Sequence, residues 1–331
     1  MNEINLNNLL DSKYSLVKDI VKKHGYNEEL SLMLTYIYVA FYLDLGPSCD
    51  YPLYDLLDKV HIIYGKGTLN DISKDLGLSP FSEGSLAVTI STPNLSVFSN
   101  DSSKQYPQTI LLGTHALNYL ATPILKLELL LHELRHALMS YYNTNCLISE
   151  NVLYMRSGLS EKWVNKDGLF IKEMGRIIDE TTNSYITELL VNKILDLKKY
   201  KINNKELNGY LETLNTNQSD KIYRTLSYNN EVKLLYPLLK NETFINLVNT
   251  HEFDGNITLI KDYINNFSTI SNYEELSNLM DYFFDNYLNY QDALKNNNNE
   301  FLDEYISVIA NIKNIVIDIE NNFSKTRKRE R

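Results

Sequence analysis

The chain has 331 residues, 44% of them hydrophobic, and a formal net charge of −10 at pH 7. This length and apolar content are enough to bury a substantial core, and the length suggests two domains. The acidic balance argues against a general nucleic-acid binder, which would present a basic face. The two cysteines, Cys49 and Cys146, allow at most one bridge, so a disulfide scaffold is excluded and a reducing compartment is favoured.

The N-terminal residues carry no pattern typical of export or membrane insertion. We expect no signal peptide, because no basic segment is followed by an apolar stretch. The longest apolar run, residues 30–43, includes a serine, a threonine and several tyrosines, and it is too short to span a bilayer. We therefore expect a cytoplasmic protein with no membrane partner, while export without a leader stays open.

Residues 6–46 predict two helices. Asn27, followed by two glutamates, is typical of a helix start, and Gly46-Pro47 is typical of a helix end.

Residues 67–79 resemble the first helix and turn of a helix-turn-helix, with Gly77 at the bend. A DNA reader would continue with a helix of basic and polar side chains, whereas residues 80–85 lead into a predicted strand. We therefore prefer a short helix capped by Gly77 and expect no nucleic-acid partner. A DNA-binding or regulatory role is the alternative.

From residue 85 the pattern favours strands. Residues 86–91 and 109–114 are rich in β-branched and apolar side chains, and a polar loop at residues 100–103 lies between them. They predict a small sheet, whose edge strand could pair with an extended peptide.

An apolar run, residues 123–131, follows this sheet. Thr122 is a plausible N-cap, and Pro123 stands at the favoured first helical position. Because the run is apolar on nearly every side, it predicts a buried helix.

This helix continues into a His-Glu-x-x-His motif. Residues four apart lie on one face of a helix, so His132 and His136 can direct ring nitrogens at one metal ion about 2.0–2.1 Å away. Glu133 then lies beside the metal, where it can take a proton from a water molecule. The motif predicts a zinc hydrolase, and a peptidase is the simplest case. The alternative is a pair of core histidines satisfied by hydrogen bonds.

Catalytic zinc sites commonly add a carboxylate ligand. The downstream candidates are Glu150, Glu161, Glu173, Asp179, Glu180 and Glu188. Helical spacing over residues 175–190 predicts a second helix, or 173–190 if it also includes Glu173. Glu180 is near its start and is followed by small polar side chains that suit a ligand held by outer hydrogen bonds. We prefer Glu180 to Glu173 and Glu188, which lie two turns before and after it. Glu188 is instead a candidate partner for Arg135.

The motif at residues 132–136 and the later segment Asp179-Glu180-x-x-x-x-Tyr185-x-x-Glu188 together resemble the zinc peptidases called gluzincins. The resemblance covers residues 85–195. It implies one bound zinc ion and a peptide or protein substrate. By this resemblance, the zinc ligands are His132, His136 and Glu180, and the general base is Glu133.

A long interval separates the two helices of this resemblance, so we expect a hairpin between them, with residues 151–159 as the candidate. The oxyanion of the reaction would need a donor. Tyr154, Arg156 and Tyr185 are the candidates.

After about residue 200 every segment is predicted to be helical, with asparagine-rich breaks at residues 203–204, 229–230, 265–266 and 296–299. The last helix places apolar residues at alternating steps of four and three, which predicts a core stripe. The stripe consists of Phe301, Tyr305, Val308, Ile312, Ile315 and Ile319.

These patterns predict an α+β protein that is mainly helical, with a small zincin-type sheet beside the His-Glu-x-x-His helix. We expect an N-terminal helical region over residues 1–84, a zincin-like catalytic core over 85–200 and an all-helical C-terminal domain over 201–331. The expected function is that of a zinc metallopeptidase. A non-catalytic zinc-binding interaction module is a further alternative.

Overall fold

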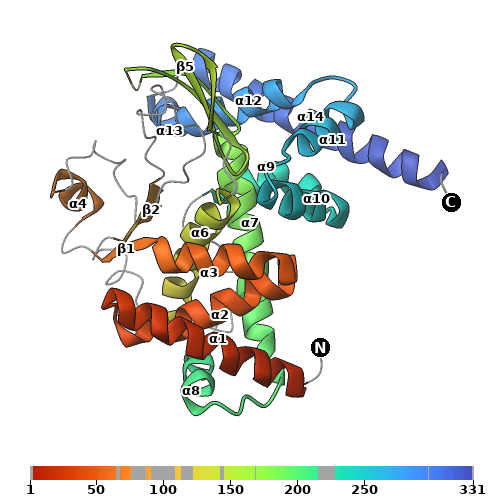
Figure 1. Ribbon diagram of the computed structural model, residues 1–331. Coiled ribbons are helices and arrows are strands. Elements are labelled where there is room, and N and C mark those ends of the chain that lie inside the picture. The colour runs from red at the N-terminus through yellow and green to blue at the C-terminus, as the bar shows by residue number, and fades with distance from the viewer. Residues whose placement is uncertain are drawn as a thin grey trace. The chain divides into compact units, whose positions relative to one another are not determined.

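The computed structural model describes residues 3–64, 68–75, 87–90, 109–112, 122–141, 145–167, 169–214, 228–296 and 298–329. These residues are mainly helical and include two small sheets, which confirms the predicted α+β class (Figure 1). The chain divides into two compact units. Unit 1 consists of residues 1–93, 106–141 and 186–225, and unit 2 of residues 94–105, 142–185 and 226–331.

Unit 1 contains the N-terminal helices. They are α1 (Glu3–His24), α2 (Glu28–Leu45), η1 (Pro47–Cys49), α3 (Asp50–Lys59) and α4 (Leu69–Asp75), and later in the chain follow α6 (Pro123–Met139), η3 (Asp196–Lys199) and α8 (Lys205–Thr213). The predicted limits of α2 are confirmed, because the Asn27 side chain accepts a hydrogen bond from the Glu29 N–H at 3.2 Å and Gly46 ends the helix with a φ of 77°. Helix α4 agrees with the predicted short helix, whereas Gly77 lies outside the described residues.

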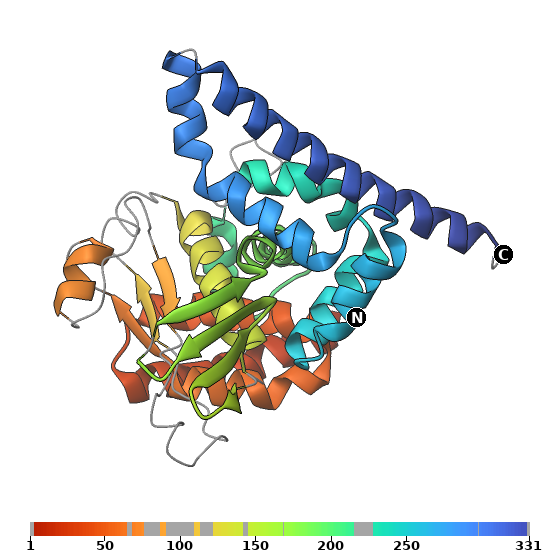
Figure 2. The same cartoon turned by 90° about the horizontal axis from the view of Figure 1, so that it is seen from above.

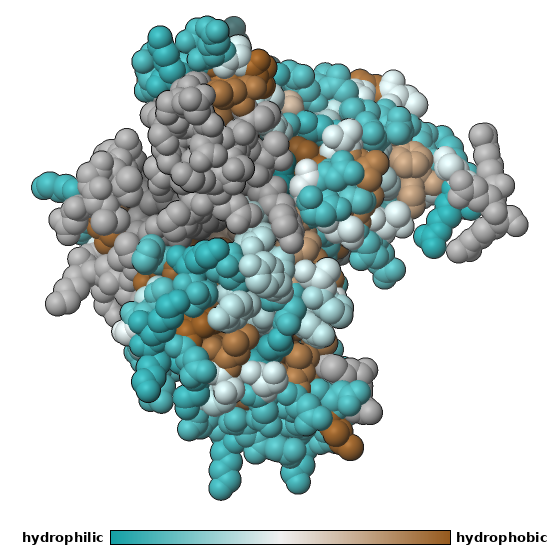
Figure 3. All heavy atoms as spheres, in the orientation of Figure 1, coloured by the Kyte–Doolittle hydropathy of each residue, from teal (hydrophilic) through white to brown (hydrophobic). Residues whose placement is uncertain are grey.

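On the face that Figure 3 shows, the surface of α1 to α3 is largely hydrophilic, with some apolar residues between the polar ones. Their apolar faces are buried, since Leu10, Val17, Ile37 and Leu53 are at most 1% exposed. Helices that expose one polar face and bury the other are the expected form of a folded helical layer.

A three-stranded sheet in unit 1 has the order β1-β3-β2, from β1 (His61–Tyr64), β2 (Ala87–Ile90) and β3 (Thr109–Leu112). Strand β3 is parallel to β1 and antiparallel to β2. The two predicted strands are confirmed as β2 and β3. Strand β1 was missed, because a four-residue apolar stretch directly after a helix gives no separate periodicity.

Unit 2 contains a four-stranded antiparallel meander in the order β4-β5-β6-β7. Its strands are β4 (Asn145–Ser149), β5 (Val152–Ser157), β6 (Ser160–Asn165) and β7 (Phe170–Met174). The predicted hairpin at residues 151–159 is confirmed in part: these residues form β5 and the turn at Gly158, whose φ is 59°, and the second strand, β6, follows them. A strand on either side extends it beyond the prediction.

The C-terminal helices of unit 2 are α9 (Asn229–Leu239), α10 (Glu242–Phe253), α11 (Thr258–Phe267), α12 (Tyr273–Asp285), α13 (Tyr287–Asn296) and α14 (Asn299–Arg329). Among the described residues after 200, the all-helical prediction is confirmed. Helix α14 is long and packs along α9, α11, α12 and α13 (Figure 2). Its predicted stripe is buried at Tyr305, Ile312, Ile315 and Ile319, each at most 3% exposed.

The asparagine-rich breaks are confirmed only in part. Asn204 caps the start of α8 by accepting from the Glu206 and Leu207 N–H groups. The prediction was wrong at residues 229–230, which begin α9, and at residues 265–266, which lie in the last turn of α11. Asparagine favours turns locally. Here the Asn265 side chain lies in the helix, and its amide oxygen accepts a hydrogen bond from the Tyr273 N–H at 2.8 Å.

Helix α7 (Arg176–Leu195) passes through the division, with its first part in unit 2 and its second part in unit 1. The predicted three-region organisation stays a prediction. No helix in the described ranges is both long enough and apolar enough to cross a membrane.

Candidate metal centre

Helix α6 carries the His-Glu-x-x-His motif. It begins at Pro123, directly after Thr122, whose backbone is extended at the N-cap position. The prediction of this start is confirmed, although the Thr122 side chain makes no capping hydrogen bond. Most of the helix is buried, including its polar side chains His132 and Glu133, which are each 6% exposed. Polar groups buried in this way need partners of their own.

The two histidines face each other across one turn of α6. Their Nε2 atoms lie 3.2 Å apart, and their rings are nearly perpendicular, with an interplanar angle of 82°. Two ligands bonded to zinc at about 2.0–2.1 Å in a tetrahedral arrangement are separated by roughly 3.3 Å. The spacing of the two nitrogens therefore fits a shared metal ion.

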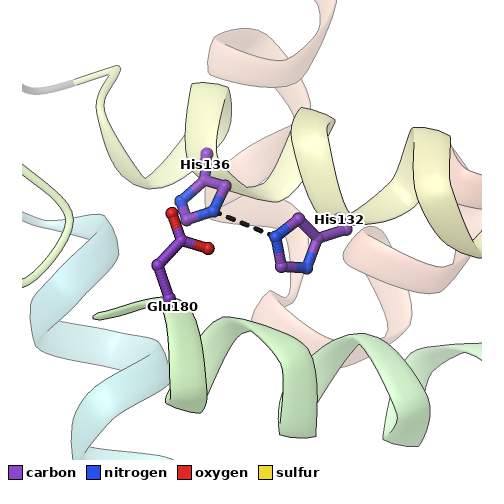
Figure 4. A group of neighbouring side chains, drawn as sticks. All are labelled: His132, His136 and Glu180. Atoms are coloured by element: carbon purple, nitrogen blue, oxygen red, sulfur yellow. Dashed lines mark hydrogen bonds between the residues drawn. The ribbon is translucent and has the colours of Figure 1, made fainter. Parts of the chain in front are cut away.

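Glu180 from α7 joins the two histidines. One ligand atom each from His132, His136 and Glu180 can be chosen so that all three lie within 4.8 Å of one another. Figure 4 shows the two imidazoles on α6 and the Glu180 carboxylate pointing toward one another. Two imidazole nitrogens and a carboxylate are a donor set found in catalytic zinc sites, so the residues present fit this metal.

The start of α7 is fixed by side chains from α12. The Ser277 hydroxyl oxygen accepts a hydrogen bond from the Gly175 N–H at 2.7 Å, and the Asp281 carboxylate accepts one from the Ile177 N–H at 3.2 Å. These bonds satisfy backbone donors that a helix start leaves without partners. Burial raises the pKa of Asp281. The hydrogen bond from the Ile177 N–H lowers this pKa, but the effect of burial is larger.

The β5–β6 turn also contacts the start of α7. The Asp179 carboxylate accepts a hydrogen bond from the Leu159 N–H at 2.7 Å. A side chain at Gly158 would meet the Asp179 Oδ1 atom at 2.3 Å and the Glu252 Oε1 atom at 2.8 Å. Glycine is therefore required at this turn both by its positive φ and by the close approach of Asp179, the residue before Glu180.

The other candidate ligands lie in different settings. Glu173 is on β7, where its carboxylate pairs with Lys162 at 2.9 Å. The predicted helix over residues 173–190 was therefore wrong at its start, because a strand and the glycine turn at Gly175 precede Arg176. Glu161 accepts from the Tyr154 hydroxyl at 2.7 Å and pairs with Lys261. Both carboxylates therefore form ion pairs with lysines of unit 2.

The remaining candidates are Glu150, Asp179 and Glu188. Glu150 is exposed in the β4–β5 turn, and Asp179 is held by the Leu159 N–H. Glu188 lies two turns after Glu180 on α7. In the described residues, Glu180 is the carboxylate that groups with the histidine pair. The suggested pairing of Glu188 with Arg135 stays a prediction.

Two of the hydroxyl groups that follow Glu180 bond to the backbone of α7. Thr181 and Thr182 are fully buried, and their hydroxyls donate to the carbonyl oxygens of Ile177 and Ile178 within α7. Hydroxyl groups in helices commonly bond to their own backbone in this way. Glu180 is therefore not held by these two threonines.

Two of the candidate oxyanion donors bond to other groups. The Tyr154 hydroxyl donates to Glu161, and the Arg156 guanidinium, 2% exposed, donates to the carbonyl oxygen of Gly158 at 2.8 Å. Burial lowers the pKa of Arg156. The ring of Tyr185 contacts Tyr236 edge to face. None of these contacts identifies an oxyanion donor.

A residue that the sequence analysis missed lies against the motif. Thr89 on β2 places its hydroxyl oxygen 2.8 Å from the Glu133 Oε2 atom and 2.9 Å from the Glu133 carbonyl oxygen. Strand periodicity predicted β2, but nothing in the sequence indicates which residue of α6 this strand would contact.

Models of known protein families, curated protein sequences and solved structures give no match to this chain.

Proposed function

We propose that the protein is a zinc-dependent peptidase of the gluzincin type. The observation that carries this proposal is the grouping of His132, His136 and Glu180, with Glu133 next to the first histidine on the same helix. A purely structural zinc site is usually closed by four cysteine or histidine ligands. Three ligands of this kind leave a position for water or substrate, which favours catalysis.

His132, His136 and Glu180 would hold the metal. A zinc ion bound there supplies a Lewis acid that polarises the scissile carbonyl and lowers the pKa of a water molecule to about 7. Glu133 accepts the proton of the attacking water and then passes it to the leaving amine. The new carbon–oxygen bond forms first, and the carbon–nitrogen bond breaks when the nitrogen takes the proton from Glu133, so the products are a carboxylate and an amine.

The substrate in this proposal is an extended peptide or a segment of a protein. Strand β2 lies at the edge of its sheet in the described part of the chain and contacts α6 through Thr89. An edge strand has unpaired backbone groups that can bond to an extended peptide. The zincin-type character of this sheet belongs to the same proposal.

The test is hydrolysis of a synthetic peptide library by zinc-loaded protein, read by mass spectrometry, with Glu133→Gln as the matched variant. We expect wild type to cleave a subset of peptides. Glu133→Gln should keep its zinc and lose at least the roughly 10²–10⁴-fold that a general base contributes. A wild type that binds zinc without cleaving any peptide would favour the non-catalytic zinc module.

Two other results would favour the remaining alternatives. A folded wild type that binds no zinc would favour core histidines that satisfy each other, since the Nε2 contact alone is compatible with a hydrogen bond. Binding to duplex DNA at low salt that weakens steeply as salt is added would favour the DNA-binding alternative.

A further inference from the structure

Thr89 makes a side-chain contact with the proposed general base. Among the described strands, β2 pairs with β3 alone, and Thr89 stands opposite Ile110 in this pairing. Its hydroxyl oxygen is within hydrogen-bond distance of two acceptors on Glu133, the carboxylate at 2.8 Å and the backbone carbonyl at 2.9 Å. A hydroxyl has one proton to donate, so the two acceptors compete for it.

The carboxylate is the stronger acceptor of the two. The Glu133 carbonyl lies inside α6, where the N–H of the residue four positions on is its regular partner. Glu133 as a whole is 6% exposed, and hydrogen bonds to a charged acceptor are roughly twice as strong as neutral ones. Within the described part of the chain, Thr89 is the side chain that donates to this carboxylate.

We propose that Thr89 is a positioning residue for Glu133. By holding the Oε2 atom, it fixes the orientation of the carboxylate and leaves the Oε1 atom to accept the proton of the attacking water. A free glutamate side chain has three rotatable bonds, and fixing them costs conformational entropy at each turnover. This inference rests on the proposed peptidase function, because it assigns Thr89 a role only through Glu133.

The matched pair of variants is Thr89→Val and Thr89→Ser. Valine keeps the branched shape and the strand preference of threonine but removes the hydroxyl, whereas serine keeps the hydroxyl and removes the methyl group. A misplaced catalytic group can cost about 10²-fold in rate, and loss of an outer hydrogen-bond partner costs about 10–100-fold in activity.

The experiment measures kcat and KM on the fastest-cleaved peptide from the library, with zinc content and thermal unfolding measured on the same samples. We expect Thr89→Val to lower kcat about 10–100-fold while KM and zinc content stay near wild type. Thr89→Ser should restore most of the activity. Adding Thr89→Val to Glu133→Gln should cause little further loss, because both changes act on one carboxylate.

Several results would overturn the proposal. One is a Thr89→Val protein with the kcat of wild type, and another is a Thr89→Ser protein as impaired as Thr89→Val. Another is a Thr89→Val protein that loses bound zinc and thermal stability along with its activity. That result would show that Thr89 has only a structural role in the contact between β2 and α6. A wild type that cleaves no peptide would overturn the peptidase function and this role together, whereas an active wild type with an unaffected Thr89→Val would overturn only the role.

Discussion

The two helices that carry the candidate metal centre are held in different ways. In α6, His132 and His136 are brought together by the helix itself, because they stand four positions apart. In α7, the start of the helix before Glu180 is held by Ser277 and Asp281, which lie 102 and 104 residues away from their partners along the chain. One half of the site is therefore a local property of a helix, and the other half depends on tertiary packing.

This difference has a consequence for mutation. A change in α6 should act on the metal centre only when it removes a ligand or breaks the helix. A change near the start of α7 should act on the centre from a distance, because it moves the helix that presents Glu180. The effect should be largest for a lost ligand and smaller for a displaced one.

The largest effect is expected for His136→Ala. Removing this ligand should weaken zinc binding by more than the roughly 10–100-fold that follows loss of an outer partner. Zinc affinity, measured by competition with a chelator, checks this expectation. His61→Ala is the control, because His61 is exposed on β1. Equal affinity in the two variants would show that the motif does not bind the metal.

A smaller but clear loss is expected for Glu180→Ala, with Glu188→Ala and Glu173→Ala as matched controls. Glu180 groups with the histidines, whereas Glu173 lies on β7 and pairs with Lys162. We expect zinc affinity to fall about 10–100-fold or more in Glu180→Ala alone. The assignment is wrong if Glu180→Ala keeps wild-type affinity while either control loses it.

The smallest effect on the metal is expected for Gly158→Ala, which tests the tertiary contacts at the start of α7. The new methyl group would collide with the carboxylate of Asp179. Gly25→Ala is a close control, because Gly25 has a similar φ of 68° and a methyl group added there would meet no atom within 4 Å beyond its chain neighbours. Both variants incur the backbone cost of a positive φ.

We expect the free energy of unfolding of Gly158→Ala to be lower than that of Gly25→Ala by about 1–3 kcal/mol, and its zinc affinity to be lower by roughly 10-fold. Urea unfolding and chelator competition measure the two quantities. If the two alanine variants are equally stable and bind zinc equally well, the β5–β6 turn does not help to position Glu180.

The same difference explains how much could be predicted from the sequence. The helix of the motif, its start at Pro123, the strands β2 and β3 and the hairpin of β5 and β6 follow from local patterns, and they are confirmed. The helical spacing over residues 175–190 gave the start of α7 to within one residue, whereas extending the helix to Glu173 placed the start too early, because Glu173 lies on a strand. A local pattern does not reveal that a strand partner at residue 162 holds Glu173 there.

The contact between Thr89 and Glu133 shows the same limit. Both elements were predicted, yet their contact joins residues 44 positions apart and depends on how the edge strand lies against α6. The roles of Thr181 and Thr182 were misjudged for a related reason, because a polar residue at a helix start can bond either to a ligand or to its own backbone. Only the structure shows that the backbone is the partner.

The most direct test of the central claim is the zinc content of purified wild type after reconstitution with excess zinc and removal of free metal. We predict one zinc ion per chain in wild type, and none in the double variant His132→Ala, His136→Ala with its fold intact by circular dichroism. Bound zinc should also raise the thermal midpoint of wild type, because a ligand that binds only the folded state stabilises it. A folded wild type without zinc would contradict the account.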